Sequence, residues 1–309
     1  MNTEDLRTFV TVVDSGSVGR AALRLSLTQP AISRRIQRLE EALGVTLLDR
    51  DSKPARPTRA GEAAYRRCMA VLRATEALAR EAQADVPTGP LRIGVSAAMA
   101  ESIFVPALDA VRTSFPHTML HLSSTRSSEL HKEVADGLID AAIVMRLPDR
   151  PIEEPGAEAL GTERVVVVGP AGVDTASPCR IVDLARFSWV INPNGCGFRS
   201  QLDRALSASG HSLDVAAQSW GTGLQLALIA RGGGLGLVPE RLIGESPHAR
   251  ALRILTVEDF RPALSVWLVR ARHLGPFAAA VDVVAATVRR LLAPDGAQSA
   301  DAARMAAAS

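Results

Sequence analysis

Residues 28–44 read TQPAISRRIQRLEEALG, and this segment has a strong helical pattern. Its large apolar residues recur at steps of four, three and four, which puts them on one helix face; they are Ile32, Ile36, Leu39 and Leu43. Thr28 offers a hydroxyl for the N-cap, Pro30 falls in the first turn, and Gly44 suits a C-terminal stop. The segment therefore predicts a helix from about Pro30 to Gly44.

Two shorter helices are expected before this one. Residues 3–14 carry four apolar side chains at helical spacings, and the sequence Ser-Gly-Ser at 15–17 ends that helix. Residues 18–25 form a second helix, which buries Ala21, Ala22 and Leu25 and ends in a turn. Two helices joined by a tight turn, with arginines on the second, are typical of a helix-turn-helix. Residues 45–58, short and rich in proline and basic side chains, suit a small hairpin or wing.

A long helical run follows at residues 59–86. Six of its positions repeat at steps of four and three, the spacing of a heptad seam; they are Ala64, Cys68, Val71, Thr75, Leu78 and Ala82. Such a seam predicts pairing with the same helix of a second chain, and the alternative is that this face packs against its own domain. Residues 85–90, DVPTGP, break the helix with two prolines, so we expect a domain boundary there.

From Leu91 onward, predicted strands alternate with predicted helices, the pattern of a parallel α/β sheet. The expected strands are 91–95, 119–123, 139–145, 161–169, 189–192, 215–220, 235–238 and 263–270. The expected helices are 102–115, 127–136, 197–209, 221–230 and 276–292. They fall into two units of similar pattern, which predicts two lobes with a ligand cleft between them.

Composition limits the class of protein. The 309 residues are 47% hydrophobic and 22% charged, as in globular proteins of at least two domains. The net charge of +2 does not by itself indicate a nucleic-acid partner, although residues 1–60 hold ten basic and seven acidic side chains. No apolar run approaches the ~18 residues that span a bilayer. The N-terminus lacks a secretory pattern, so we expect a cytoplasmic chain that does not enter a membrane.

No motif for catalysis or for a cofactor stands out. The three cysteines are widely spaced, which argues against a disulfide framework and a zinc cluster; they are Cys68, Cys179 and Cys196. Glycines at 232–234 and 236 match neither the G-x-G-x-x-G pattern of dinucleotide-binding proteins nor the P-loop pattern with its lysine. His117 and His121 flank a predicted strand without a third metal ligand. The sequence therefore predicts a protein that is not an enzyme and has no cofactor or metal.

The first sixty residues resemble the DNA-binding domain of LysR-type transcriptional regulators. Residues 28–44 resemble the family's recognition helix, LLDR at 47–50 its Leu-Phe-x-Arg start of the wing, and PTRAG at 57–61 its Leu-Thr-x-Ala-Gly start of the linker helix. Weaker similarities follow in order, at LRIG (91–94), GLIDAAI (137–143) and GGGLGLVP (232–239). The resemblance thus covers residues 1 to about 292.

This resemblance implies an α/β protein with four parts. These are a winged helix-turn-helix at 1–58, a linker and dimerisation helix at 59–86, a two-lobed, periplasmic-binding-protein-like effector domain at 87–293, and a disordered tail at 294–309. Lobe I is expected at about 91–161 and 267–293, and lobe II at about 162–266. The implied function is sequence-specific binding of double-stranded promoter DNA, modulated by a small-molecule effector. The implied assembly is a homodimer that forms a homotetramer, with RNA polymerase as a partner if the protein activates transcription.

The recognition helix predicts the DNA contacts. In a helix-turn-helix, its N-terminal part meets base edges in the major groove. Arg can bond guanine, Gln can bond adenine, and proline can touch a thymine methyl. We therefore expect base contacts from Gln29, Pro30, Ser33 and Arg34. Phosphate contacts are expected from Arg35, Arg38, Arg50, Lys53 and Arg56. The alternative for each is a solvated surface charge.

The effector contacts are expected where strands end and helices begin, because free backbone N–H groups lie there. Those positions, at which the family also holds its effector, are Ser96, Ala97, Ala98, Thr125, Ser127, Gly221 and Thr222. Family members often carry Ser or Thr where this chain has Ala98, so Ser96 is the expected substitute. Arg146, and Arg199 after the loop that holds Asn194, are expected to pair with a carboxylate, the alternative being structural salt bridges. The alternative function is a two-lobed solute-binding or enzymatic protein with a helical extension.

Overall fold

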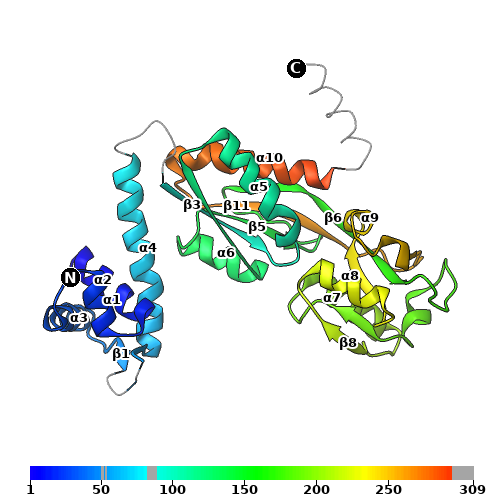
Figure 1. The fold of residues 1–309 in the computed structure, drawn as a ribbon, viewed down its shortest axis with the longest axis horizontal. Coiled ribbons are helices and arrows are strands. Elements are labelled where there is room, and N and C mark those ends of the chain that lie inside the picture. The colour runs from blue at the N-terminus through cyan, green and yellow to red at the C-terminus, as the bar shows by residue number, and fades with distance from the viewer. Residues whose placement is uncertain (50–51, 53, 82–88, 294–309) are drawn as a thin grey trace. The chain divides into compact units, whose positions relative to one another are not determined.

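The computed structural model describes residues 1–49, 52, 54–81 and 89–293. The chain divides into two compact units, one of Met1–Thr88 with Lys132–Ile139 and the other of Gly89–His131 with Asp140–Ser309. The helices and strands of both are labelled in Figure 1. Among the described helices, none has the length and apolar character needed to cross a membrane.

The first unit begins with three helices, α1 (Thr3–Ser15), α2 (Val18–Arg24) and α3 (Gln29–Leu43). The predicted ends of α3 are confirmed. Thr28 accepts a hydrogen bond from the Ala31 N–H, and Gly44 takes the left-handed conformation, with φ at 68°. Ile32, Ile36 and Leu39 are buried, but Leu43 is 42% exposed, so the apolar face ends one turn earlier than predicted.

The wing consists of two short antiparallel strands, β1 (Leu48–Asp49) and β2 (Arg56–Pro57), and α4 (Arg59–Glu81) follows. Thr58 caps α4, because its hydroxyl accepts a hydrogen bond from the Gly61 N–H at 3.0 Å. Gly61 lies so close to the wing that a Cβ there would come within 2.0 Å of the Leu47 carbonyl oxygen. This close approach explains why a glycine follows the capping threonine.

The heptad pattern of α4 covers two different environments. Cys68 is buried with Leu72 in the core of the helix-turn-helix, and Ala64 packs against the same core. Val71 and Leu78 are 46% and 68% exposed, and Thr75 is also exposed. The prediction that Cys68 belongs to a seam with a second chain is therefore corrected: its own domain covers it. Ala82 lies outside the described residues.

A mixed sheet forms the frame of the second unit, with strand order β10-β6-β11-β5-β3-β4 and with β9 also paired to β6. The strands are β3 (Gly89–Ser96), β4 (Thr118–Thr125), β5 (Ala141–Arg146), β6 (Ala157–Pro170), β9 (Gly236–Pro239), β10 (Leu252–Leu255) and β11 (Ala263–Arg270). Strands β3, β4 and β5 are parallel, whereas β11 is antiparallel to both β5 and β6. The expected parallel sheet is thus only part of the architecture.

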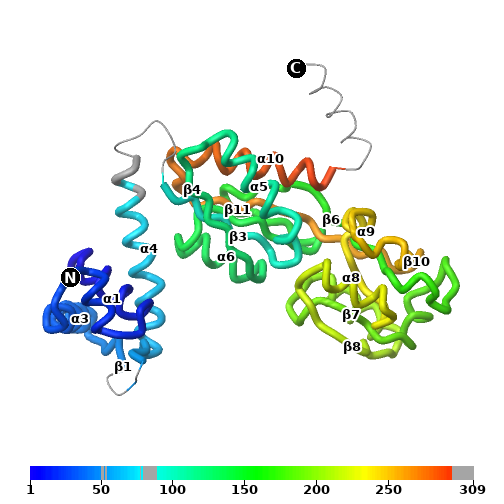
Figure 2. The backbone as a smooth tube through the Cα atoms, in the orientation of Figure 1, coloured from blue at the N-terminus to red at the C-terminus, as the bar shows by residue number. Residues whose placement is uncertain are grey.

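Strands β6 and β11 are antiparallel because they carry the chain between two lobes in opposite directions (Figure 2). Lobe I contains β3, β4 and β5 with the helices α5 (Ala100–Ser114), α6 (Ser127–Ala135) and α10 (Ala278–Leu292). In Figure 1, α5 and α10 cover one side of the sheet and α6 lies on the other. Buried side chains from β3, β5, α5 and α10 form one core there.

Lobe II contains the second half of β6 together with β9 and β10. It also contains a parallel pair of strands, β7 (Trp189–Ile191) and β8 (Val215–Gln218). Its helices are α7 (Gly197–Ala208), α8 (Thr222–Ala230) and the short α9 (Arg241–Gly244). Three single-turn 3-10 helices complete the unit, η1 (Ile181–Leu184), η2 (Ala249–Ala251) and η3 (Gly275–Phe277). Strand β10, which the sequence pattern did not predict, is four residues long and pairs with the end of β6.

Candidate DNA-binding and effector-binding sites

The four predicted base-reading residues lie on the exposed face of the N-terminal half of α3. Gln29, Ser33 and Arg34 make no side-chain hydrogen bond or ion pair within the described part of the first unit. Gln29 and Ser33 also line a groove of about 850 Å³ bounded by α2, α3 and the wing. Arg20 of α2 lines the same groove and was missed, because it lies ahead of the turn that marks the recognition helix.

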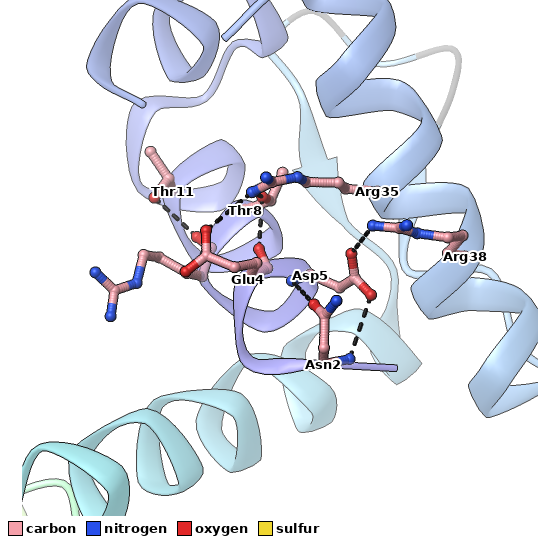
Figure 3. Close-up of polar contacts among 8 residues, drawn as sticks. Asn2, Glu4, Asp5, Thr8, Thr11, Arg35 and Arg38 are labelled. Carbon is pink, nitrogen blue, oxygen red and sulfur yellow. Dashed lines mark hydrogen bonds and ion pairs between the residues drawn. The ribbon is translucent and has the colours of Figure 1, made fainter. Parts of the chain in front are cut away.

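Arg35 and Arg38 do not line this groove. Both side chains point from α3 toward residues of α1 (Figure 3). Arg35 donates to the Glu4 carboxylate at 3.1 Å and to the Thr8 hydroxyl at 3.3 Å. Arg38 pairs with Asp5, whose side chain is only 1% exposed. Both guanidinium groups thus join α3 to α1, and their predicted phosphate contacts stay a prediction.

Asp5 is held from two further directions. Its backbone N–H donates to the Asn2 side chain at 2.9 Å, and the Asn2 backbone N–H donates back to its carboxylate at 3.3 Å. This capping box fixes the start of α1 and aims the carboxylate at Arg38. Among the other predicted phosphate contacts, Arg56 is exposed on β2. Arg50 and Lys53 lie outside the described residues.

A cavity of about 420 Å³ lies between the two lobes of the second unit. Four of the predicted effector residues line it, namely Ser96, Ala98, Ser127 and Arg146. Lobe II contributes Gly195, Cys196 and Trp220. An adjoining hollow is lined by Ala97, Thr125, Asn194 and Gly221, also as predicted. The cavity and the hollow share Arg126 and Trp220, so the two are neighbours.

The hydroxyls in the cavity are held in place. Ser127 accepts a hydrogen bond from the Met145 backbone N–H at 3.0 Å and donates to the Ser96 hydroxyl at 3.3 Å. The Ser96 proton is then free to point at a ligand. Ser96 is therefore positioned for the role that we expected it to take over from Ala98.

The cavity is strongly basic. Arg126, Arg146 and Arg150 line it, together with His131. Arg126 is paired with Glu129, and His131 lies 2.8 Å from Glu154. The side chains of Arg146 and Arg150 have no hydrogen bond or ion pair to any residue that the structure describes. Two guanidinium groups are thus available for an anion.

Sequence reasoning missed His131 and Arg150, and from residues 125–128 it selected Thr125 and Ser127 but not Arg126 or Ser128. Arg126 and Ser128 flank Ser127, so the start of α6 was a signal for both. Arg150 lies four residues beyond Arg146, in the segment after β5, and only the tertiary fold brings it to the cavity.

Arg199 and Thr222 do not line either space. Arg199 is 11% exposed, donates to the Asn192 carbonyl at 3.3 Å and lies 3.6 Å from Asp203. These contacts favour the alternative of a structural ion pair, and its predicted contact with an effector stays a prediction. The Thr222 backbone N–H donates instead to the Glu101 carboxylate, a residue that the sequence analysis did not single out.

Two titratable groups, one in the cavity and one in the adjoining hollow, have shifted pKa values. Burial raises the pKa of the Cys196 thiol, which keeps it protonated. Hydrogen bonds from Thr125 and Arg126 lower the pKa of Glu129, which therefore stays charged and paired. No set of three or more His, Cys, Asp or Glu among the described residues is placed to hold a metal ion.

Two family models match the chain. The model described as "Bacterial regulatory helix-turn-helix protein, lysR family" matches residues 3–62, and "LysR substrate binding domain" matches residues 84–292. The Escherichia coli nitrogen assimilation regulatory protein nac is 29% identical over 290 residues, which are 91% of this chain and 93% of that protein. The RuBisCO operon transcriptional regulator of Allochromatium vinosum is also 29% identical, over 91% of this chain and 94% of its own length.

Solved structures share the fold. A full-length OxyR variant from Pseudomonas aeruginosa has a TM-score of 0.69 at 22% identity, over 94% of this chain and 95% of that one. Full-length CbnR in complex with its target DNA has a TM-score of 0.66 at 22% identity, over 94% and 99% of the two chains. At this identity the similarity concerns the fold alone.

Proposed function

Because this chain belongs to the LysR family of bacterial transcriptional regulators, we propose that an organic anion bound between the two lobes controls its action on DNA. The family assignment makes it a DNA-binding regulator with an effector-binding domain. The helix-turn-helix match and the named regulators among its relatives decide against the alternative of a solute-binding protein or an enzyme. As a protein that acts on promoter DNA, it is expected to work in the cytoplasm.

The unpaired guanidinium groups of Arg146 and Arg150 carry this proposal. They face a cavity of about 420 Å³, within the ~300–1,000 Å³ typical of small-molecule sites. A guanidinium binds a carboxylate with two parallel hydrogen bonds, and Ser96 and Ser127 add hydroxyls beside it. Val144, Leu147 and Leu264 line the same cavity and favour an apolar body for the ligand.

Isothermal titration of the full chain with a panel of organic acids tests the proposal. We expect at least one acid to bind, and Arg146→Ala to weaken it by roughly 10- to 100-fold, the cost of losing a charged hydrogen-bond partner. Arg112→Ala is the matched control, because Arg112 is exposed on α5 and lines neither the cavity nor the hollow. Absence of binding across the panel, or equal binding by both variants, would contradict the proposal.

For the DNA, we propose that Gln29, Pro30, Ser33 and Arg34 read bases and that the wing residue Arg56 contacts phosphate. Their support is exposure on the free face of α3 and on β2. Arg50 and Lys53 keep the same proposed phosphate role. Pairing of α4 between two chains would place two recognition helices, one α3 from each chain, on the two half-sites of one operator.

For the assembly, we propose a homodimer through the exposed positions of α4, Val71, Thr75 and Leu78, which forms a tetramer through the effector domains. If the protein activates transcription, RNA polymerase is a further partner. The exposed apolar side chains of Val71 and Leu78 support the dimer, because they need a cover that their own domain does not provide.

A further inference from the structure

The N-terminus of α8 in lobe II is capped by a residue of lobe I. The Glu101 carboxylate accepts a hydrogen bond from the Thr222 N–H at 2.8 Å, and both of its oxygens lie 3.3 Å from the Gly223 nitrogen. Glu101 belongs to the first turn of α5, 121 residues away in the sequence. One carboxylate therefore joins the two lobes across the cleft.

The α8 helix needs this carboxylate. The first N–H groups of a helix have no partner within the helix, and a side chain at the N-cap usually satisfies them. Here the N-cap residue is Gly221, which has no side chain to offer. Thr222 is only 6% exposed, so its backbone N–H needs a partner within the protein. A negative charge at a helix N-terminus also interacts favourably with the helix dipole.

The glycine at position 223 is consistent with this contact. A Cβ at this position would come within 2.9 Å of the Glu101 carboxylate, although the backbone there is not in the left-handed region that favours glycine. The glycine thus leaves space for the carboxylate. Ser102, which follows Glu101 on α5, makes a second bridge between the lobes. Arg241 of α9 donates to the Ser102 hydroxyl at 2.9 Å while it pairs with the buried Glu163.

We propose that Glu101 is a built-in ligand of the effector cleft. Its carboxylate occupies the N-terminal end of α8 and joins the lobes there. An anionic effector is then restricted to the cavity lined by Arg146 and Arg150. This last restriction rests on the function proposed above, and the occupancy of α8 by Glu101 does not.

The hollow beside α8 agrees with such a restriction. Glu101 and Glu129 both line it, and its one arginine, Arg126, is already paired with Glu129. An incoming anion meets two carboxylates there and two unpaired guanidinium groups in the neighbouring cavity. Like charges disfavour the first position and opposite charges favour the second.

Amide hydrogen exchange of the full chain, without any effector, tests the occupancy. In Glu101→Ala, the Thr222 and Gly223 amides should exchange about tenfold faster or more, because they lose a charged acceptor. Glu101→Gln should have a smaller effect, since an amide oxygen still accepts one hydrogen bond. Gly223→Ala should accelerate exchange at Thr222 by displacing the carboxylate. The matched control is Asp109→Ala, an exposed carboxylate of the same helix, which should change neither amide.

Formate then tests whether the end of α8 is an anion position. Added to Glu101→Ala, formate should restore protection of Thr222, whereas chloride at the same ionic strength should not, and formate should leave the wild-type chain unchanged. Unchanged exchange in Glu101→Ala would overturn the cap, and accelerated exchange without rescue by formate would overturn the anion position. Neither result depends on the organic-acid titration, so failure of the effector proposal is seen separately.

Discussion

Arg34, Arg35 and Arg38 are neighbours in sequence, yet they have different surroundings. Arg34 is exposed and unpaired within the described residues, whereas Arg35 and Arg38 are bound to carboxylates of α1. A guanidinium that neutralises the buried Asp5 carboxylate contributes to stability, because that charge cannot be hydrated. The recognition helix thus has one basic residue free for DNA and two that fix its position on α1.

The first prediction compares Arg38→Ala with Arg34→Ala. Loss of Arg38 leaves Asp5 without its cation and should lower the free energy of unfolding by about 1–2 kcal/mol, a buried-pair cost reduced because Arg38 is half exposed. Arg34→Ala should change it by less than about 0.5 kcal/mol. Urea denaturation measures both. In operator binding we expect the reverse, because Arg34→Ala should alter sequence preference more than Arg38→Ala does. Equal effects of the two variants on sequence preference would contradict this division of roles.

The second prediction concerns Tyr65, the one tyrosine in the chain. Its hydroxyl donates to the Asp14 carboxylate, and burial together with this contact raises its pKa to about 12 from an ordinary 10.0. Folding therefore favours the protonated phenol. The stability that it contributes should be complete below pH 10 and lost as the pH rises from 10 towards 12.

Ultraviolet absorbance of the phenolate measures this pKa directly, because no other tyrosine contributes. Tyr65→Phe should lower stability at neutral pH by about 1 kcal/mol, the value of a typical hydrogen bond. It should also remove part of the alkaline loss of stability. A phenolate titration midpoint near 10 in the folded protein would contradict the prediction.

Local pattern predicted the helices of the first unit well, because caps and apolar spacing act within one helix. Thr28, Gly44 and the stripe from Ile32 to Leu39 needed no tertiary information. The heptad pattern of α4 was less informative, since periodicity identifies an apolar face and not what covers it. Cys68 packs on α1, whereas Leu78 on the same face stays exposed.

The third prediction uses this difference along α4. Leu78→Glu should dissociate the proposed dimer, because a charge in an apolar seam between helices is costly. The fold of each chain should persist, since Leu78 is no part of the core. Leu23→Glu, at an even more exposed leucine of α2, is the control and should leave the dimer intact. Sedimentation equilibrium distinguishes the species, and a monomeric wild-type chain would exclude the seam altogether.

For the molecule as a whole, most strands and helices could be predicted from the sequence, although β10 and the antiparallel direction of β11 could not, and the effector cavity was predicted only in part. Ser96 and Ser127 follow strand ends, a position with a general rule behind it. Glu101 meets Thr222, which is 121 residues away in the sequence, because β6 and β11 bring the two lobes together. Arg150 lines the cavity beside Arg146 without a side-chain partner among the described residues, and no local spacing records either position.

The last prediction links the two functions. If the effector changes operator affinity by some factor, bound operator must change effector affinity by the same factor, typically about 5- to 150-fold. Fluorescence anisotropy of labelled operator, with and without the acid identified by titration, measures the first factor, and titration of the operator complex measures the second. Arg146→Ala should keep the effector-free operator affinity, because Arg146 lies in the second unit, and should lose the response to the acid. A normal response to the acid in Arg146→Ala would place the regulatory ligand outside the arginine-lined cavity. If the acid and the operator changed each other's affinity by unequal factors, a further linked equilibrium, such as assembly, would take part.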